Sequence, residues 1–257
     1  GGLRRDPAEA TIQVFNVAPV VRIEIEGLRK GGVLEGNSVD LTAGVTDPGT
    51  AQFQYTWTVT RNGDPFDSAN TPGYTFAPPD EGTYEITVTV SDGAASASDS
   101  LSIVVGGKAP TAVPRVSLGS IYQGDTFTFG LEDVQDGPDD IAVGFTYSFD
   151  LDGDWEFEIA GVTAAFQEVT IRRSGRHVLR ARVMDKDGLC SDYMMLVDIL
   201  NKSPAVSVDQ TTAVVAVGGA LELSGAFTDP GEDQWRGIAE IRKEGDPRAT
   251  ILPLLLR

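Results

Sequence analysis

The sequence predicts an all-β protein made of small β-sandwich domains in tandem, the last of them incomplete. Apolar and polar residues alternate along many short segments, which is the pattern of half-buried strands. These segments recur at the spacing of one small domain. The 257 residues include 29 glycines and 14 prolines, which is typical of a chain with many turns. The length suits two ordinary domains or three short ones.

Three similar junctions mark the repeat: Asn16-Val-Ala-Pro19, Lys108-Ala-Pro110 and Asn201-Lys-Ser-Pro204. The prolines at 19, 110 and 204 are 91 and 94 residues apart, about the length of one small sandwich. Each junction follows one alternating segment and precedes another. The junctions therefore predict four parts, which are 1–17 as the last strand of a preceding repeat or a linker, 18–106 as sandwich 1, 107–203 as sandwich 2 and 204–257 as a truncated sandwich 3.

The alternation also predicts which side chains form the two cores, because successive residues of a strand point to opposite faces. In sandwich 1 the predicted core faces are Val21, Ile23 and Ile25, then Val39, Leu41, Ala43 and Val45, then Phe53, Tyr55, Trp57 and Val59. In sandwich 2 they are Phe127, Phe129 and Leu131, then Phe145, Tyr147, Phe149 and Leu151, then His177, Leu179, Ala181 and Val183.

The third repeat opens with an alternating segment and then reaches TDPG at residues 228–231, which repeats TDPG at residues 46–49. Residues 204–257 number 54, too few for a complete sandwich of this repeat. We therefore expect its apolar strands to lack part of their partner sheet.

The segment GTYEITVTVSDG, residues 82–93, together with the Asn-x-Ala-Pro junction, the Asp-Pro-Gly turn and the Tyr-x-Trp strand, resembles polycystic kidney disease (PKD) domains. The resemblance implies seven-stranded immunoglobulin-like sandwiches of large secreted or cell-surface proteins, here of bacterial type. It covers nearly the whole chain. The family's Trp-Asp-Phe-Gly-Asp-Gly motif is absent from YTWTVTRNGD and only approximated by YSFDLDGD.

Tyr84 follows a glycine at the start of an alternating strand, where a tyrosine corner bonds its hydroxyl back to the main chain. The equivalent segment of the second repeat, Gly175-Arg-His177, has the chain's single histidine in the place of the tyrosine. We therefore interpret His177 as a structural corner residue rather than a ligand or a base.

An acidic segment, FTYSFDLDGDWEFEI at residues 145–159, contains five carboxylates: Asp150, Asp152, Asp154, Glu156 and Glu158. A hairpin with a loop at 152–154 would place Phe149 opposite Phe157 on the core face and Asp150 opposite Glu156 on the other. Like charges directly opposite repel, so this segment predicts either a calcium site or a solvated acidic face. It matches an EF-hand loop poorly, since Trp155 stands where the glycine belongs.

The family resemblance implies a second location for calcium, at the junctions. Carried over by motif, the ligands in the first repeat are Asn16, Asp47 and Asp92. In the second repeat they are Asp133 or Asp136 together with Asp185, although Lys108 near this place opposes a cation. Ordinary turn chemistry accounts for the same aspartates equally well.

The 20 basic and 38 acidic side chains give a net charge of −18, which repels nucleic acid and anionic membrane surfaces. No apolar run is long enough to span a membrane. The single cysteine, Cys190, cannot form a disulfide within the chain and is expected to be a half-buried hydrophobe.

No motif of a known catalytic site is present, so we expect no enzyme activity. Two functions remain. The first is a structural or adhesive spacer of an extracellular multidomain protein, with neighbouring repeats as its partners and calcium as its expected cofactor. The second is an accessory module that binds polysaccharide or another protein. Polysaccharide binding needs exposed aromatic rings, for which Trp155 and Trp235 are the candidates.

Overall fold

The computed structural model describes residues 11–26, 32–49, 52–117, 119–209, 214, 224–231, 237–242 and 249–254. By their contacts, the residues form two compact units. Unit 1 comprises Gly1–Thr111, Val134–Phe145 and Met184–Ser191, and unit 2 comprises Ala112–Asp133, Thr146–Val183 and Asp192–Arg257. The domain boundaries given above remain predictions.

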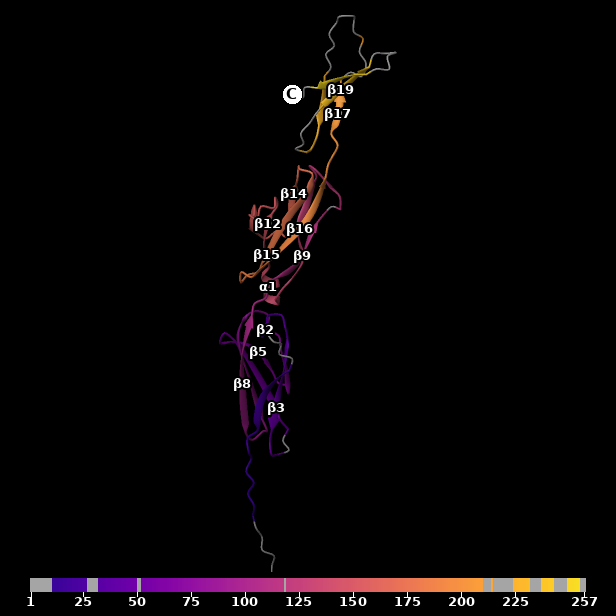
Figure 1. Ribbon diagram of the computed structural model, residues 1–257. Helices are drawn as coiled ribbons and strands as arrows, with labels where there is room; N and C mark the ends of the chain where they lie inside the picture. The colour runs from indigo at the N-terminus through magenta and orange to yellow at the C-terminus, as the bar shows by residue number, and fades with distance from the viewer. Residues whose placement is uncertain are drawn as a thin grey trace, which may run out of the picture. The chain divides into compact units, whose positions relative to one another are not determined.

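The first sandwich consists of two sheets (Figure 1, indigo to magenta). One has three strands in the order β1 (Val20–Glu26), β3 (Val39–Thr46), β6 (Gly73–Phe76). The other has five, in the order β2 (Val33–Leu34), β8 (Ser96–Gly106), β7 (Gly82–Ser91), β4 (Gln54–Arg61), β5 (Asp64–Ala69). The pairing of β2 with β8 is parallel, while β7 pairs antiparallel with both β4 and β8.

The second sandwich repeats this topology strand for strand. Its three-stranded sheet has the order β14 (Phe166–Thr170), β11 (Thr126–Gln135), β9 (Thr111–Val116). Its five-stranded sheet has the order β10 (Ile121–Tyr122), β16 (Cys190–Leu200), β15 (Gly175–Met184), β12 (Thr146–Asp150), β13 (Ile159–Val162). Helix α1 (Pro138–Val143) lies between β11 and β12 in the chain. The predicted all-β fold of immunoglobulin-like sandwiches in tandem is confirmed.

The described residues after 204 include two short antiparallel pairs. Strand β17 (Ala205–Val208) pairs with β18 (Gly225–Thr228), and β19 (Gly237–Arg242) pairs with β20 (Ala249–Leu254). Residues 11–17, the described part of the segment 1–17 expected to be the last strand of a preceding repeat or a linker, form no strand. Within the described ranges, no helix has the length and apolar character needed to cross a membrane.

The alternation in the sequence identified most of both cores. The first core holds Leu41, Trp57, Val59, Tyr84 and Ile86, each at most 2% exposed, and Val45, Phe53 and Tyr55 pack against it. In the second core Phe129 packs edge-on against Phe149, with ring centroids 6.1 Å apart. Cys190 is exposed, so its expected half-buried position is wrong.

The predicted hairpin at residues 145–159 is wrong. Strand β12 pairs with β13 so that Phe149 lies opposite Ile159 and Tyr147 opposite Val162. The connection is therefore the eight-residue segment 151–158 rather than a loop of three residues. That hairpin would also have placed Trp155 on the core face, opposite Leu151, but Trp155 is 77% exposed.

The corner interpretation is confirmed in both sandwiches. The buried Tyr84 hydroxyl donates a hydrogen bond to the backbone carbonyl of Asp80, 2.9 Å away and four residues earlier. Nε2 of His177 lies 2.8 Å from the carbonyl oxygen of Arg173, also four residues earlier. The same main-chain contact is thus made by a phenol in one repeat and by an imidazole in the other.

Candidate cation sites

The acidic loop, defined here as residues 150–158, is organised around the buried carboxylate of Asp150, which ends strand β12 and is 0% exposed. Its Oδ1 accepts a hydrogen bond from the backbone N–H of Gly153 at 2.6 Å, and its Oδ2 accepts one from Trp155 at 3.0 Å. The loop folds around this side chain because Gly153 and Trp155 both adopt positive φ angles, of 87° and 79°. An Asp-x-x-Gly segment favours such a turn.

Arg180 from strand β15 completes this arrangement. Its Nη1 lies 2.8 Å from Asp150 Oδ2, and its guanidinium stacks on the indole of Trp155, 3.6 Å from the ring centroid. Burial acts to raise the pKa of Asp150, but Arg180 and the two N–H groups outweigh it and lower that pKa. The charge predicted to repel Glu156 is therefore paired with a guanidinium.

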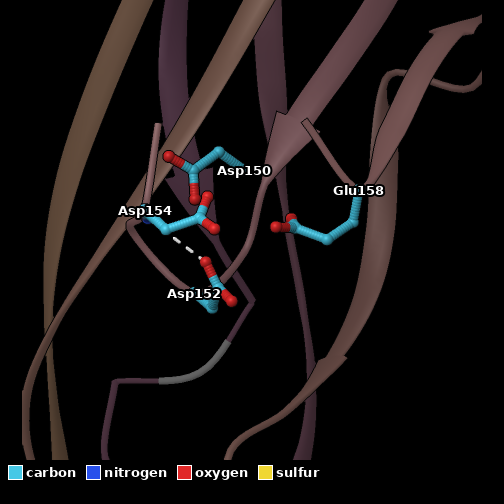
Figure 2. A group of neighbouring side chains, drawn as sticks. All are labelled: Asp150, Asp152, Asp154 and Glu158. Carbon is cyan, nitrogen blue, oxygen red and sulfur yellow. Dashed lines mark hydrogen bonds between the residues drawn. The ribbon is translucent and has the colours of Figure 1, made fainter. Parts of the chain in front are cut away.

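Four carboxylates of the acidic loop nevertheless converge on one region. Figure 2 shows the side chains of Asp150, Asp152, Asp154 and Glu158, each of which offers an oxygen within 4.8 Å of the others. Glu156 does not belong to this group. The Asp152, Asp154 and Glu158 oxygens accept backbone hydrogen bonds from Asp154, Glu156 and Leu151 respectively. Cation binding by this loop remains a prediction, and backbone N–H groups of the loop itself donate to an oxygen of each of these three carboxylates.

The junction residues of the first repeat are brought together only in part. Asn16 Nδ2 donates to Asp92 Oδ2 at 2.9 Å, and this bond, with the N–H groups of Ala95 and Ala94, lowers the pKa of Asp92. Asp47 Oδ1 instead accepts from the N–H of Gly49 at 2.6 Å. These contacts are those of capped turns. They agree with the alternative explanation of these aspartates, which was ordinary turn chemistry.

In the second repeat the three predicted aspartates differ in their surroundings. Asp133, in unit 2, is exposed and has a φ of 54°. Asp185, in unit 1, caps a turn by accepting hydrogen bonds from the N–H groups of Asp187 and Leu189, both at 2.9 Å. Asp136, also in unit 1, has two buried carboxylate oxygens without a hydrogen-bond partner.

Asp136 belongs to a cluster within unit 1 that the sequence did not reveal. We name it the Glu35 cluster, and its members are Glu35, Arg61, Asp80, Glu81, Asp136, Asp140 and Lys186. They come from five parts of the chain, which are the segment after β2, the end of β4, the turn before β7, residues 134–145 and residues 184–191.

Two cations neutralise one side of the Glu35 cluster. Lys186 Nζ lies 2.6 Å from Asp80 Oδ1 and 3.2 Å from Asp140 Oδ1, and Arg61 pairs with Asp80 Oδ2. Burial acts to raise the pKa of Asp80, but the side-chain hydrogen bonds with Lys186, Glu81 and Arg61 lower it. Asp80 is therefore a fully paired carboxylate.

On the other side of the cluster, Asp140 shares Lys186 with Asp80, and Glu35 and Asp136 have no salt bridge among the described residues. Glu35 is 1% exposed and Asp140 is 0% exposed. Glu35 Oε1 accepts a hydrogen bond from the backbone N–H of Lys108 at 2.6 Å. Burial raises the pKa of Glu35 to about 7, with the negative charges of Asp140 and Asp136 adding to the rise. Burial likewise raises the pKa of Asp136.

Sequence reasoning missed Glu35 and Asp140, although one signal was available for Glu35. Glu35-Gly36 follows β2 as Gln123-Gly124 follows β10, so Glu35 and Gln123 hold equivalent positions. One repeat has an acid at this position and the other has its neutral isostere. The difference indicates that the charge has a role beyond the fold itself. The role of Asp140 could not be recognised, because the described residues between β3 and β4 include no counterpart of α1.

One comparison with protein families gives a match, and it lies in the first repeat. Residues 24–105 match the family model of the PKD domain. No curated protein matches the chain. Among solved structures, the chain is similar to the fibronectin(III)-like modules of Clostridium thermocellum CbhA, with 14% identity, 70% of this chain and 95% of that chain covered, and a TM-score of 0.29.

Two further structures are similar. One contains three N-terminal domains of the bacteriophage RB49 highly immunogenic outer capsid protein, with 17% identity, 91% of this chain and 79% of that chain covered, and a TM-score of 0.29. The other contains the titin domains z1z2 in complex with telethonin, with 13% identity, 74% of this chain and 100% of that chain covered, and a TM-score of 0.34.

Proposed function

We propose that this chain, whose residues 24–105 form a PKD domain, is a non-catalytic structural or adhesive spacer of an extracellular multidomain protein. The observation that carries the proposal is the repetition of one sandwich topology, strand for strand, within one chain. Repeated modules contact mainly their neighbours along the chain, and we propose that these modules hold other parts of a protein at a distance. The extracellular location is proposed because PKD domains occur in extracellular proteins.

The residues repeated between the sandwiches support a structural role. Tyr84 and His177 occupy the equivalent corner and both contact the main chain. Asp92 and Asp185 occupy equivalent turns, and each accepts hydrogen bonds from two backbone N–H groups. The polar groups at equivalent positions of the two sandwiches thus stabilise turns, as a structural role as a spacer requires.

Recognition of polysaccharide is the weaker alternative. Trp57 is buried in the first core, and one face of the exposed Trp155 is covered by the guanidinium of Arg180. Trp235 lies outside the described residues. A polysaccharide site usually presents several uncovered rings in a row, and the described part of the chain does not favour one.

Calcium is the proposed cofactor of the spacer. The support is chemical: the chain carries a net charge of −18, and hard carboxylate oxygens are the ligands that calcium prefers. An ion bound between carboxylates of different segments would stiffen the module, because it removes their mutual repulsion and links their backbones.

Small-angle X-ray scattering on the purified chain tests the spacer proposal. A compact domain of 257 residues has a radius of gyration of about 18 Å. A spacer must keep its ends apart, so we expect a clearly larger value that is independent of protein concentration. A radius near that of a compact domain would contradict the proposal.

A further inference from the structure

The Glu35 cluster contains buried carboxylate oxygens that lack partners. Glu35 Oε2, both oxygens of Asp136 and both oxygens of Asp140 are inaccessible to solvent and lack a hydrogen bond of standard geometry, while the Glu35 and Asp140 carboxyl groups lie close enough to share a proton. Of these five atoms only Asp140 Oδ1 has an ion-pair partner, Lys186 at 3.2 Å. A buried carboxylate without partners is costly, so native proteins pair it with a cation or protonate it.

The cationic side chains nearby are too few to neutralise these acids. Three positive charges, on Arg61, Lys108 and Lys186, face eight carboxylates in unit 1, which are Glu35, Asp80, Glu81, Asp136, Asp139, Asp140, Asp185 and Asp187. The difference is five negative charges. Lys186 is shared among four carboxylates, Asp80, Glu81, Asp140 and Asp187. Glu35 and Asp136 have no salt bridge to any of the three cations within the described residues.

The second sandwich shows that the fold itself does not require a charge at this position. Gln123, the equivalent of Glu35, is also 0% exposed, and its Oε1 accepts the backbone N–H of Lys202 at 3.2 Å. Glu35 Oε1 accepts the N–H of Lys108 in the same way. A neutral amide therefore suffices for the structural bond, and the negative charge of Glu35 needs another explanation.

The backbone beside Glu35 is shaped to admit its carboxylate. A Cβ atom at Gly137 would lie 2.8 Å from Glu35 Cδ and 2.9 Å from its Oε2. The absence of a side chain at residue 137 thus lets the Glu35 carboxylate approach the segment that carries Asp136 and Asp140. Three carboxylates from segments about 100 residues apart in sequence are brought to one place.

We propose that Glu35, Asp136 and Asp140 bind a calcium ion within unit 1. Each offers an oxygen within 4.8 Å of the others. Calcium binds oxygens at about 2.4 Å, so two ligands on opposite sides of the ion are about 4.8 Å apart. The ion removes two of the five uncompensated charges and gives partners to the orphaned oxygens. This inference rests on the proposed function in that calcium is the cofactor proposed for the spacer.

Calcium fits these residues better than magnesium. Calcium takes six to eight oxygens in irregular geometry, so three carboxylates from a loop and a short helix can be completed by main-chain carbonyls and water. Magnesium requires near-octahedral geometry and dehydrates reluctantly. Calcium should therefore bind at least tenfold more tightly than magnesium.

Isothermal titration calorimetry of the full chain, with calcium or magnesium chloride added to chelator-treated protein, tests the proposal. The variants are Glu35→Gln and Asp140→Asn. Glu35→Gln can still accept the N–H of Lys108, as Gln123 accepts the N–H of Lys202 in the second sandwich. The matched control is Glu158→Gln, which removes one carboxylate from the acidic loop. Circular dichroism melting verifies that each variant is folded.

We expect calcium binding with at least a tenfold loss of affinity in Glu35→Gln and in Asp140→Asn, and unchanged affinity at this site in Glu158→Gln. A second ion held by the acidic loop would appear as a separate binding event that only Glu158→Gln weakens. Unchanged binding in folded Glu35→Gln would overturn the proposed site while leaving calcium as a cofactor. Absence of calcium binding up to roughly 10 mM, about tenfold above the weak end of 1 mM for extracellular modules, would overturn both, and the scattering experiment would still decide the spacer function.

Discussion

The hydroxyl of Tyr84 donates a hydrogen bond to the backbone carbonyl oxygen of Asp80, 2.9 Å away. The Tyr84 ring itself is 0% exposed and packs edge-on against Phe76, with centroids 5.0 Å apart. The corner thus combines aromatic packing with one buried polar contact. His177 makes the equivalent contact in the second sandwich from a half-buried position.

Replacing Tyr84 with phenylalanine should lower the free energy of unfolding by about 1–3 kcal/mol, because it leaves the Asp80 carbonyl buried without its donor. The ring contacts are retained. Urea denaturation followed by fluorescence measures the change. Tyr122→Phe, at a side chain that is 42% exposed, is the control and should change stability by less than about 0.5 kcal/mol. Equal effects of the two variants would show that the corner bond contributes nothing.

Arg180 should be essential to the acidic loop, because Arg180→Met leaves the buried carboxylate of Asp150 without its counterion. We expect a loss of about 3–5 kcal/mol. The matched control is Arg176→Met, which breaks an exposed pair with Asp198 and should cost less than about 1 kcal/mol. Chemical denaturation of both variants provides the comparison, and similar losses would contradict a special role for the buried pair.

The same pair predicts how stability depends on pH. The pKa of Asp150 is lowered in the folded protein, so the folded chain binds this proton more weakly than the unfolded chain. The contribution of Asp150 is therefore present above its ordinary pKa of about 4 and is lost as the pH falls through the lower folded pKa. Arg180→Met should reduce the slope of stability against pH in that acid range. An unchanged slope would mean that Arg180 does not set the pKa.

Glu35→Gln should stabilise the protein in the presence of chelator at pH 8. The pKa of Glu35 is raised to about 7, so the stabilising effect of its proton is complete below the ordinary pKa of about 4.5 and is lost as the pH rises through 7. The gain in the variant should reach up to about 3 kcal/mol at pH 8 and vanish near pH 4. Thermal melting at the two pH values measures it, and a variant that is less stable at pH 8 would contradict the prediction.

Gly137→Ala should destabilise unit 1 by about 1–3 kcal/mol, because the added Cβ would lie 2.8 Å from Glu35 Cδ. Gly119→Ala is the matched control, since a Cβ at Gly119 meets no atom within 4 Å. Thermal melting of the two variants gives the comparison. If both behave alike, the close approach of Glu35 to residue 137 is not a constraint.

The sequence by itself determined the strands, most of the two cores, the repeat and the corner residues. These features depend on local pattern: alternation with a period of two places Leu41, Trp57 and Leu179 on buried faces whatever the rest of the chain does. His177 was identified because the repeat places it at the position of Tyr84. Such positions are defined by neighbours close in sequence.

Only the tertiary structure decided which charged side chains are buried and which groups they pair with. Arg180, 30 residues from Asp150, converts an expected repulsion into a buried ion pair, and the connection after β12 is eight residues long. Glu35, Asp136 and Asp140 meet although about 100 residues separate the first from the others. Whether a carboxylate is buried, and which charge faces it, depends on desolvation and on distances between remote segments, and neither is encoded in a local pattern.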